Sequence, residues 1–223
     1  MKKICLIILF LFSLGSIIGL RKGVTPTASA DSAPAETVEV ITITPTIDTF
    51  LNMSPGASAP APDGQFFFVG ADEFTYEAIG LIQFDLSQIP AEAVIESAQL
   101  TLSHDSSQST NSLARIICVK QITSSWNAAV TTSNVPAIHE FCHAQREVAF
   151  ENGNHTWSDL GQLVQGWVIE PTMNFGLALD LLENGYGYKA FHSADSANPP
   201  TLEITYTVPD TTKFIFLPLV IKE

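Results

Sequence analysis

Apolar and polar residues alternate in two adjacent stretches near the middle of the chain. In residues 81–90, Ile82, Phe84 and Leu86 fall on one side of an extended backbone, and polar residues fall on the other. A period of two is typical of a β-strand that buries one face in a core. Residues 97–103 continue the alternation. The pattern predicts two neighbouring strands of an antiparallel sheet, joined by a short connection.

Short runs with the same character recur along the rest of the chain. They predict strands within 38–50, 65–70, 115–123, 175–181, 186–191 and 201–208. A short strand is also expected in 147–150, whereas 130–147 shows no pattern that assigns it. Many short strands separated by turn residues are typical of sandwiches and barrels. The predicted fold is therefore all-β, a jelly-roll-like β-sandwich.

One helix interrupts the strands. Apolar residues recur every three or four positions from residue 160, which places them on one face of a helix. Ser158 is the expected N-cap, and Pro171 is expected to end the helix. The apolar face consists of Leu160, Leu163, Val164, Trp167 and Val168.

The two ends of the chain differ from the part between them. Residues 1–30 have a charged start, an apolar run and a small-residue cleavage site, so they are predicted to be a signal peptide. An uncleaved membrane anchor is the alternative. Residues 31–37 are expected to be a linker, and 38–208 the folded domain. The hydrophobic tail, 209–223, is either a surface-retention signal or a further edge strand. The protein is expected to be secreted or held at the cell surface.

The net charge of the chain limits the classes of partner that it is expected to bind. The formal net charge is −13, and cleavage after Ala30 would remove four basic residues and no acidic one, leaving −17. So acidic a protein is not expected to bind nucleic acid or anionic lipid, because like charges repel. The acidic excess fits either solvation in an extracellular medium or binding of a divalent cation.

Two cysteines, Cys118 and Cys142, follow the predicted signal peptide. An even number of cysteines in an exported chain predicts a disulfide between them. Two buried free thiols are the alternative.

Nine segments of the chain resemble, in order, the DNRLRE-domain family, which overlaps with carbohydrate-binding module family 96. The segments are IDTF, FFFVG, LIQFDLSQIP, VIESAQLTL, KQITSSWN, WSDLGQLVQGWV, NFGLAL, FHSAD and PPTLEITY, and together they span about residues 46–208. The resemblance implies a secreted β-sandwich that binds a polysaccharide and catalyses no reaction.

The chain departs from this family in two places. The hexapeptide that names the family is absent, and Ser193-Ala194-Asp195 stands where many members have Ser-Arg-acid. Without that arginine, and with a strongly negative charge, an acidic polysaccharide is a poor ligand. A neutral glycan, or one bridged by a cation, is expected instead.

Four aromatic residues are candidates for stacking on sugar rings, whose C–H faces suit an aromatic face. Trp157 lies just before the predicted helix and is the best candidate among the tryptophans for an exposed platform, with a position in the core as the alternative. Tyr186 and Tyr188 are expected to share one face of a strand near a glycine-rich turn, either to bind a sugar or to form ordinary cross-strand pairs. Trp126 is expected in the core, with a place on a binding face as the alternative.

Acidic residues in predicted loops are candidates for a calcium site, because calcium prefers carboxylate oxygens. Solvated acids are the alternative. The candidates are Asp48, Asp72, Glu73 and Asp195.

Residues 139–143 match the zinc-peptidase pattern H-E-x-x-H through His139, Glu140 and His143. That chemistry requires a helix, which places the two histidines one turn apart on the metal. In a β-rich domain the match is expected to be a coincidence in a loop, and Cys142 is expected in the disulfide.

The sequence therefore predicts a non-catalytic polysaccharide-binding module. The alternatives are an adhesive surface protein with a protein partner, and a zinc peptidase.

Overall fold

The computed structural model describes residues 37–54, 64–71, 77–110, 113–183 and 185–209. The predicted signal peptide lies outside these residues, as do nearly all of the linker and of the C-terminal tail. No helix within the described ranges is long and apolar enough to cross a membrane.

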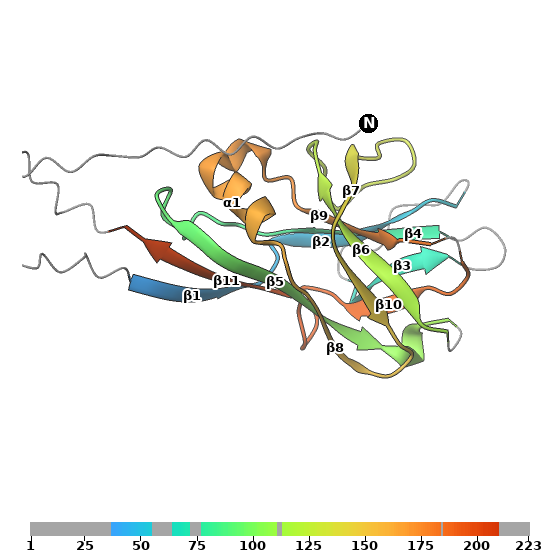
Figure 1. Ribbon diagram of the computed structural model, residues 1–223. Helices are drawn as coiled ribbons and strands as arrows, with labels where there is room; N and C mark the ends of the chain where they lie inside the picture. Colours follow the sequence, from blue (N-terminus) through green and yellow to red (C-terminus); the bar gives the residue numbers. More distant parts are fainter. Residues whose placement is uncertain (1–36, 55–63, 72–76, 111–112, 184, 210–223) are drawn as a thin grey trace, which may run out of the picture. The chain divides into compact units, whose positions relative to one another are not determined.

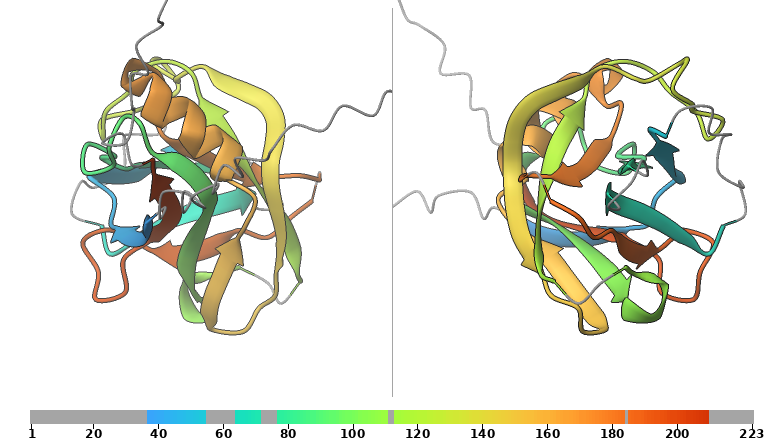
Figure 2. Two further views of the ribbon diagram at one scale, coloured as in Figure 1. Left: turned by 60° about the vertical axis from the view of Figure 1, so that its left-hand side comes forward. Right: turned by 90° about the vertical axis from the view of Figure 1, so that its right-hand side faces the viewer.

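In the described part of the chain, eleven antiparallel strands form one curled sheet with two facing halves (Figures 1 and 2). The first half contains β1 (Thr37–Ile43), β3 (Phe66–Ala71), β5 (Val94–Asp105), β8 (Gly153–Trp157), β10 (Lys189–His192) and β11 (Thr201–Val208). The second half contains β2 (Ile47–Asn52), β4 (Glu77–Gln83), β6 (Arg115–Ile122), β7 (Ile138–Val148) and β9 (Leu177–Leu181). Strand β3 joins the halves, since it pairs with both β10 and β4. The prediction of an all-β, sandwich-like fold is confirmed.

The main core lies between the two halves. Alternate residues of each half point inward, as the two-residue period of a strand requires. Large buried side chains at its centre include Phe67, Phe84, Trp157 and Phe191. A smaller outer cluster lies on the opposite face of the second half, where the segment after β6 covers it. Its buried members are Leu51, Leu81, Ile122, Val130 and Ala178.

The prediction that the stretches 81–90 and 97–103 pair with each other is wrong. Strand β4 ends at Gln83 and pairs with β2, β3 and β9, whereas β5 pairs with β8, β10 and β11. The chain crosses from one half of the sheet to the other between them. The alternation continues beyond β4 because Phe84 and Leu86 still point into the core from the crossing segment.

The alternation of apolar and polar residues did not predict the observed strands β7 and β8. Strand β7 runs over Ile138–Val148, much longer than the strand expected in 147–150. It pairs only with β6 among the described strands, and Val148 is its only fully buried residue. An edge strand with both faces largely in water needs no alternation of apolar residues, so its sequence carries no signal.

The predicted helix is α1 (Gly161–Ile169), and it packs its apolar face on β5 and the main core. A 3₁₀ turn, η2 (Pro171–Met173), follows it, and another, η1 (Ser106–Gln108), follows β5. Ser158 is not the N-cap as predicted. Leu160 holds that position, without a side-chain hydrogen bond, and its N–H donates to the carbonyl of Ala98 at 3.2 Å. The start of α1 is therefore held by β5 instead of by a capping side chain.

The predicted disulfide between Cys118 and Cys142 is present. It links β6 to β7, with 5.6 Å between the two Cα atoms. The bond therefore fastens the edge strand β7 to the rest of its sheet.

Removing the disulfide by Cys118→Ala and Cys142→Ala is expected to lower the free energy of unfolding by about 2–4 kcal/mol, because the unfolded chain gains freedom. Thermal melting with and without reductant measures the loss. Reductant should lower the melting temperature of the wild type and leave that of the double variant unchanged. A wild type insensitive to reductant, with the bond shown to be reduced, would contradict the prediction.

Candidate functional site

An open groove lies where β3 and β9 end and β4 begins. We name it the Tyr186 groove, and it has a volume of about 470 Å³. It is lined by Gly70, Ala71, Glu77, Asp180, Leu181, Glu183, Gly185 and Tyr186. A side pocket of about 130 Å³ shares three of these residues and adds Ala114, Arg115, Ile116 and Glu147. The two together extend the site from β3 to the edge strand β7.

The Tyr186 side chain is 55% exposed. Backbone contacts fix its position: the N–H of Gly187 donates to the carbonyl of Ala71 at 2.5 Å, and the Arg115 guanidinium donates to the Tyr186 carbonyl. Gly70 makes the close approach possible, because a Cβ there would lie 2.7 Å from the Gly187 carbonyl oxygen. The groove thus presents an accessible aromatic ring on a held backbone.

Acidic side chains dominate the groove and its side pocket. Glu77, Asp180, Glu183 and Glu147 line them, and Arg115 is the basic residue among the lining residues. A salt bridge of 2.7 Å joins Asp180 to Lys120 and fixes that carboxylate. Carboxylate oxygens accept hydrogen bonds from hydroxyl groups and repel other anions. An aromatic ring beside such acceptors matches a neutral sugar, which has an apolar face and hydroxyl groups at its edge.

The family model of carbohydrate-binding module family 96 matches residues 39–206. The chain belongs to carbohydrate-binding module family 96. The match covers the domain from β1 to β11, so the resemblance drawn from the sequence and the carbohydrate-binding function that it implied are confirmed. A comparison with curated proteins found no match.

Trp157, the tryptophan that best fitted an exposed platform, is not one, and its alternative position in the core is the one observed. This tryptophan is 1% exposed, and its Nε1–H donates to the carbonyl of Ile117 at 2.9 Å. It ends β8, where pairing with Leu100 of β5 turns its side chain into the core. A tryptophan just before a helix was equally compatible with both directions, and only the register of β8 decides between them.

Tyr186 and Tyr188 occupy different environments in the structure. Strand β10 begins at Lys189, so Tyr186 and Tyr188 precede it and do not share a strand face as predicted. The half-buried Tyr188 ring makes an edge contact with Phe68 at 5.4 Å between centroids. Trp126 is half-buried against the outer cluster, and its Nε1–H donates to the carbonyl of Phe175 at 2.7 Å. Of the four aromatic candidates, Tyr186 is the most exposed.

Residues 139–143 lie on strand β7, neither in the expected loop nor on a helix. An extended chain rises about 3.3 Å per residue, so His139 and His143 are not one helical turn apart as zinc binding by this motif requires. Cys142 between them is held in the disulfide. Within the described residues no group of three or more His, Cys, Asp or Glu side chains could hold a metal ion.

The structure brings together two of the four predicted calcium ligands. Asp48 Oδ2 accepts a hydrogen bond of 2.8 Å from the N–H of Ala194. Burial raises the pKa of Asp48 to about 6; the hydrogen bond from Ala194 opposes this rise, and the nearby charge of Asp195 adds to it. Asp72 and Glu73 lie outside the described residues. The calcium site stays a prediction, and a rise in melting temperature on adding calcium, reversed by chelator, would test it.

Sequence reasoning missed the carboxylates of the Tyr186 groove. Glu77 begins β4, Asp180 lies in β9, and Glu183 follows β9, so more than 100 positions separate the first from the other two. Each is an ordinary acidic residue in the sequence. Only the pairing of β3 and β9 along the same strand, β4, places them around one space.

Proposed function

We propose that this module is a non-catalytic, extracellular domain that binds a neutral polysaccharide along the Tyr186 groove. The observation that carries the proposal is the exposed ring of Tyr186 among several carboxylates. Stacking would hold the sugar ring, and the carboxylates would accept hydrogen bonds from its hydroxyl groups. An open groove would admit an internal segment of a long chain as well as an end.

Three further features support an exported, non-catalytic binding module. The disulfide fits an oxidising compartment outside the cytoplasm, in agreement with the signal peptide predicted from residues 1–30. The zinc-peptidase pattern lies on a strand, which does not provide the geometry that such catalysis requires. Membership in a family of carbohydrate-binding modules favours binding over catalysis.

Affinity electrophoresis of the mature chain in gels that contain neutral or acidic polysaccharides tests the proposal. We expect retardation by at least one neutral polymer and none by polyuronates or sulfated glycans, since the groove is acidic. Retardation by acidic polymers alone, without calcium, would contradict the assignment of a neutral ligand. Parallel gels with calcium and with chelator would detect a glycan bridged by a cation.

Replacing Tyr186 by alanine is expected to weaken polysaccharide binding about tenfold, because a stacked aromatic ring contributes about 1–1.5 kcal/mol. Isothermal titration with the retarding polymer measures the change. Phe141→Ala is the matched control, since Phe141 is a 60% exposed aromatic residue on β7 that does not line the groove. Equal losses of affinity in both variants, or none in Tyr186→Ala, would place the binding site elsewhere.

A further inference from the structure

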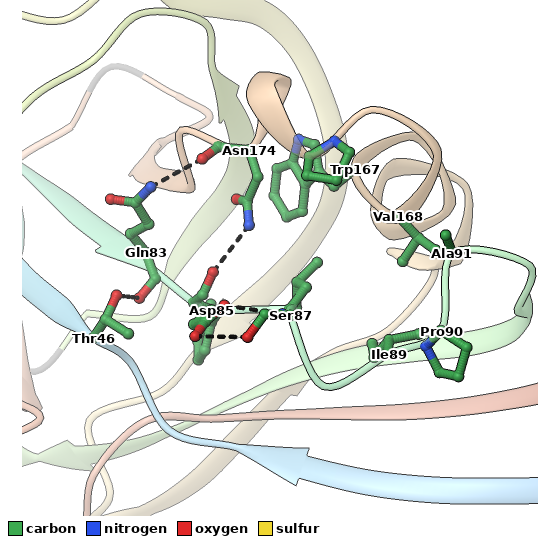
Figure 3. A pocket seen from close by; sticks show the side chains of 13 residues that line it. Thr46, Gln83, Asp85, Ser87, Ile89, Pro90, Ala91, Trp167, Val168 and Asn174 are labelled. Atoms are coloured by element: carbon green, nitrogen blue, oxygen red, sulfur yellow. Dashed lines mark hydrogen bonds between the residues drawn. The ribbon is translucent and has the colours of Figure 1, made fainter.

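A second, larger pocket lies at the other end of β4, between helix α1 and the segment that crosses from β4 to β5 (Figure 3). We name it the α1 pocket, and its volume is about 670 Å³. It shares no lining residue with the Tyr186 groove. Glu77 and Gln83, which line the groove and the α1 pocket respectively, are the first and last residues of β4. At about 3.3 Å per residue, some 20 Å separates the two sites.

One wall of the α1 pocket is polar and held by hydrogen bonds. The Gln83 side-chain amide donates to the carbonyl of Asn174 at 2.9 Å, and the Asn174 amide donates to the carbonyl of Phe84 at 2.9 Å. Thr46 adds a hydroxyl that donates to the Gln83 carbonyl at 3.2 Å. These bonds tie together three segments that are distant in the sequence. Polar groups so fixed cost little ordering entropy when a ligand binds.

The opposite wall is apolar. Figure 3 shows Trp167 and Val168 of α1 on this side, together with the turn Ile89-Pro90-Ala91. The pocket therefore offers hydrophobic surface to one face of a ligand and hydrogen-bonding groups to its other side. Ligand pockets combine these two kinds of surface in the same way.

The charge of the lining disfavours an anionic ligand. Asp85 is the only ionisable side chain among the described residues that line the pocket. Its carboxylate accepts hydrogen bonds from the N–H and the hydroxyl of Ser87, at 2.9 and 3.0 Å, and these lower the pKa of Asp85. The pocket is thus negative at neutral pH, so it accepts hydroxyl donors and repels carboxylate, sulfate and phosphate.

Two polar atoms of the lining residues add to this picture. Trp167 Nε1 and Asn174 Oδ1 are buried and have no hydrogen-bond partner within the described residues. An unpaired buried donor or acceptor costs free energy. A ligand hydroxyl group could accept a hydrogen bond from an indole N–H or donate one to an amide oxygen, so hydroxyl groups suit either of these atoms.

We propose that the α1 pocket binds one uncharged sugar residue, the end or a branch of a glycan, as a second site separate from the Tyr186 groove. The proposal goes beyond the function assigned to the groove. Two sites about 20 Å apart on one module would engage a single polymer together, so the second contact would form at high effective concentration. Polymers would then bind more tightly than short oligosaccharides without any new contact.

The indole N–H signals of the three tryptophans provide a direct test. The full chain is titrated with D-glucose, D-xylose and D-mannose up to 200 mM while two-dimensional ¹H–¹⁵N spectra are recorded. We expect the Trp167 signal, assigned from a Trp167→Phe variant, to shift with at least one sugar in a saturable way. The signals of Trp126 and Trp157, which do not line the α1 pocket, serve as internal controls.

Ala91→Trp is the blocking variant, because Ala91 is exposed and its larger replacement would occupy the pocket. Ala197→Trp, at an exposed position between β10 and β11, is the matched control. We expect Ala91→Trp to reduce apparent sugar affinity at least tenfold and Ala197→Trp to leave it unchanged. A Trp167 signal that no sugar shifts, or one that shifts equally in Ala91→Trp, would overturn the proposal.

The two sites can fail independently in this experiment. If the Tyr186 groove is not a glycan site, Tyr186→Ala will leave polymer binding unchanged while the Trp167 signal still responds to sugar. If the α1 pocket is not a sugar site, polymer retardation will still depend on Tyr186 while the Trp167 signal stays fixed.

Discussion

Replacing Trp157 by alanine is expected to destabilise the module by about 3–5 kcal/mol, because the loss of a large core side chain leaves a cavity. The indole lies in the main core, in edge contact with Phe191 at 6.0 Å between centroids. In a domain of this size the melting temperature should fall by about 10–15 °C. Had Trp157 been an exposed platform, the variant would fold normally and lose only glycan affinity.

A conservative variant separates packing from hydrogen bonding. Trp157→Phe keeps an aromatic ring in the core but removes the indole N–H that bonds to the Ile117 carbonyl. We expect it to lose about 1–2 kcal/mol, clearly less than Trp157→Ala. Urea unfolding of both variants measures the two losses. A Trp157→Ala protein as stable as the wild type would contradict the burial of this side chain.

Replacing Asp48 by asparagine is expected to stabilise the module by about 2–3 kcal/mol at pH 7.5. Burial raises the pKa of this carboxyl to about 6, so ionising it in the folded state costs free energy at neutral pH. Asparagine removes that charge, and its side-chain oxygen can still accept the bond from the Ala194 N–H. The substitution also removes the electrostatic repulsion between the carboxylates of residues 48 and 195.

The stabilisation should depend on pH in a defined window. Between the ordinary aspartate pKa of 3.8 and about 6, the folded state binds the Asp48 proton more tightly than the unfolded state. The wild type therefore gains stability relative to Asp48→Asn as the pH falls through 6, and the advantage of the variant should be gone near pH 4. Comparing the two proteins isolates this group from His155, whose pKa burial lowers to about 4, with the opposite effect on stability.

Asp195→Asn is the control, because Asp195 is exposed and carries the neighbouring charge. It should stabilise the module by less than Asp48→Asn. Urea unfolding from pH 4 to 8 measures all three proteins. An advantage of Asp48→Asn that is equal at every pH would show that its effect does not come from the carboxyl proton.

The strands with a buried face could be predicted from the sequence because each exposes one side to water and the other to the core. Strand β11 (Thr201–Val208) has the bounds that its alternation predicts, and β6 (Arg115–Ile122) begins where expected. The same local periodicity located α1 and its apolar face. The disulfide followed from the two cysteines left after a predicted signal peptide.

The sequence by itself thus determined the fold class, the main-core positions of most strands and, through ordered motifs, the carbohydrate-binding family. Only the tertiary structure decided which strands pair, which way Trp157 points, and that Glu77 and Glu183 line one groove with Tyr186. The physical reason is that periodicity is a local property of the chain, whereas tertiary contacts join distant parts of it. Periodicity reports whether a side chain faces water or the core, whereas strand pairing and binding sites depend on contacts between residues that are distant in the chain.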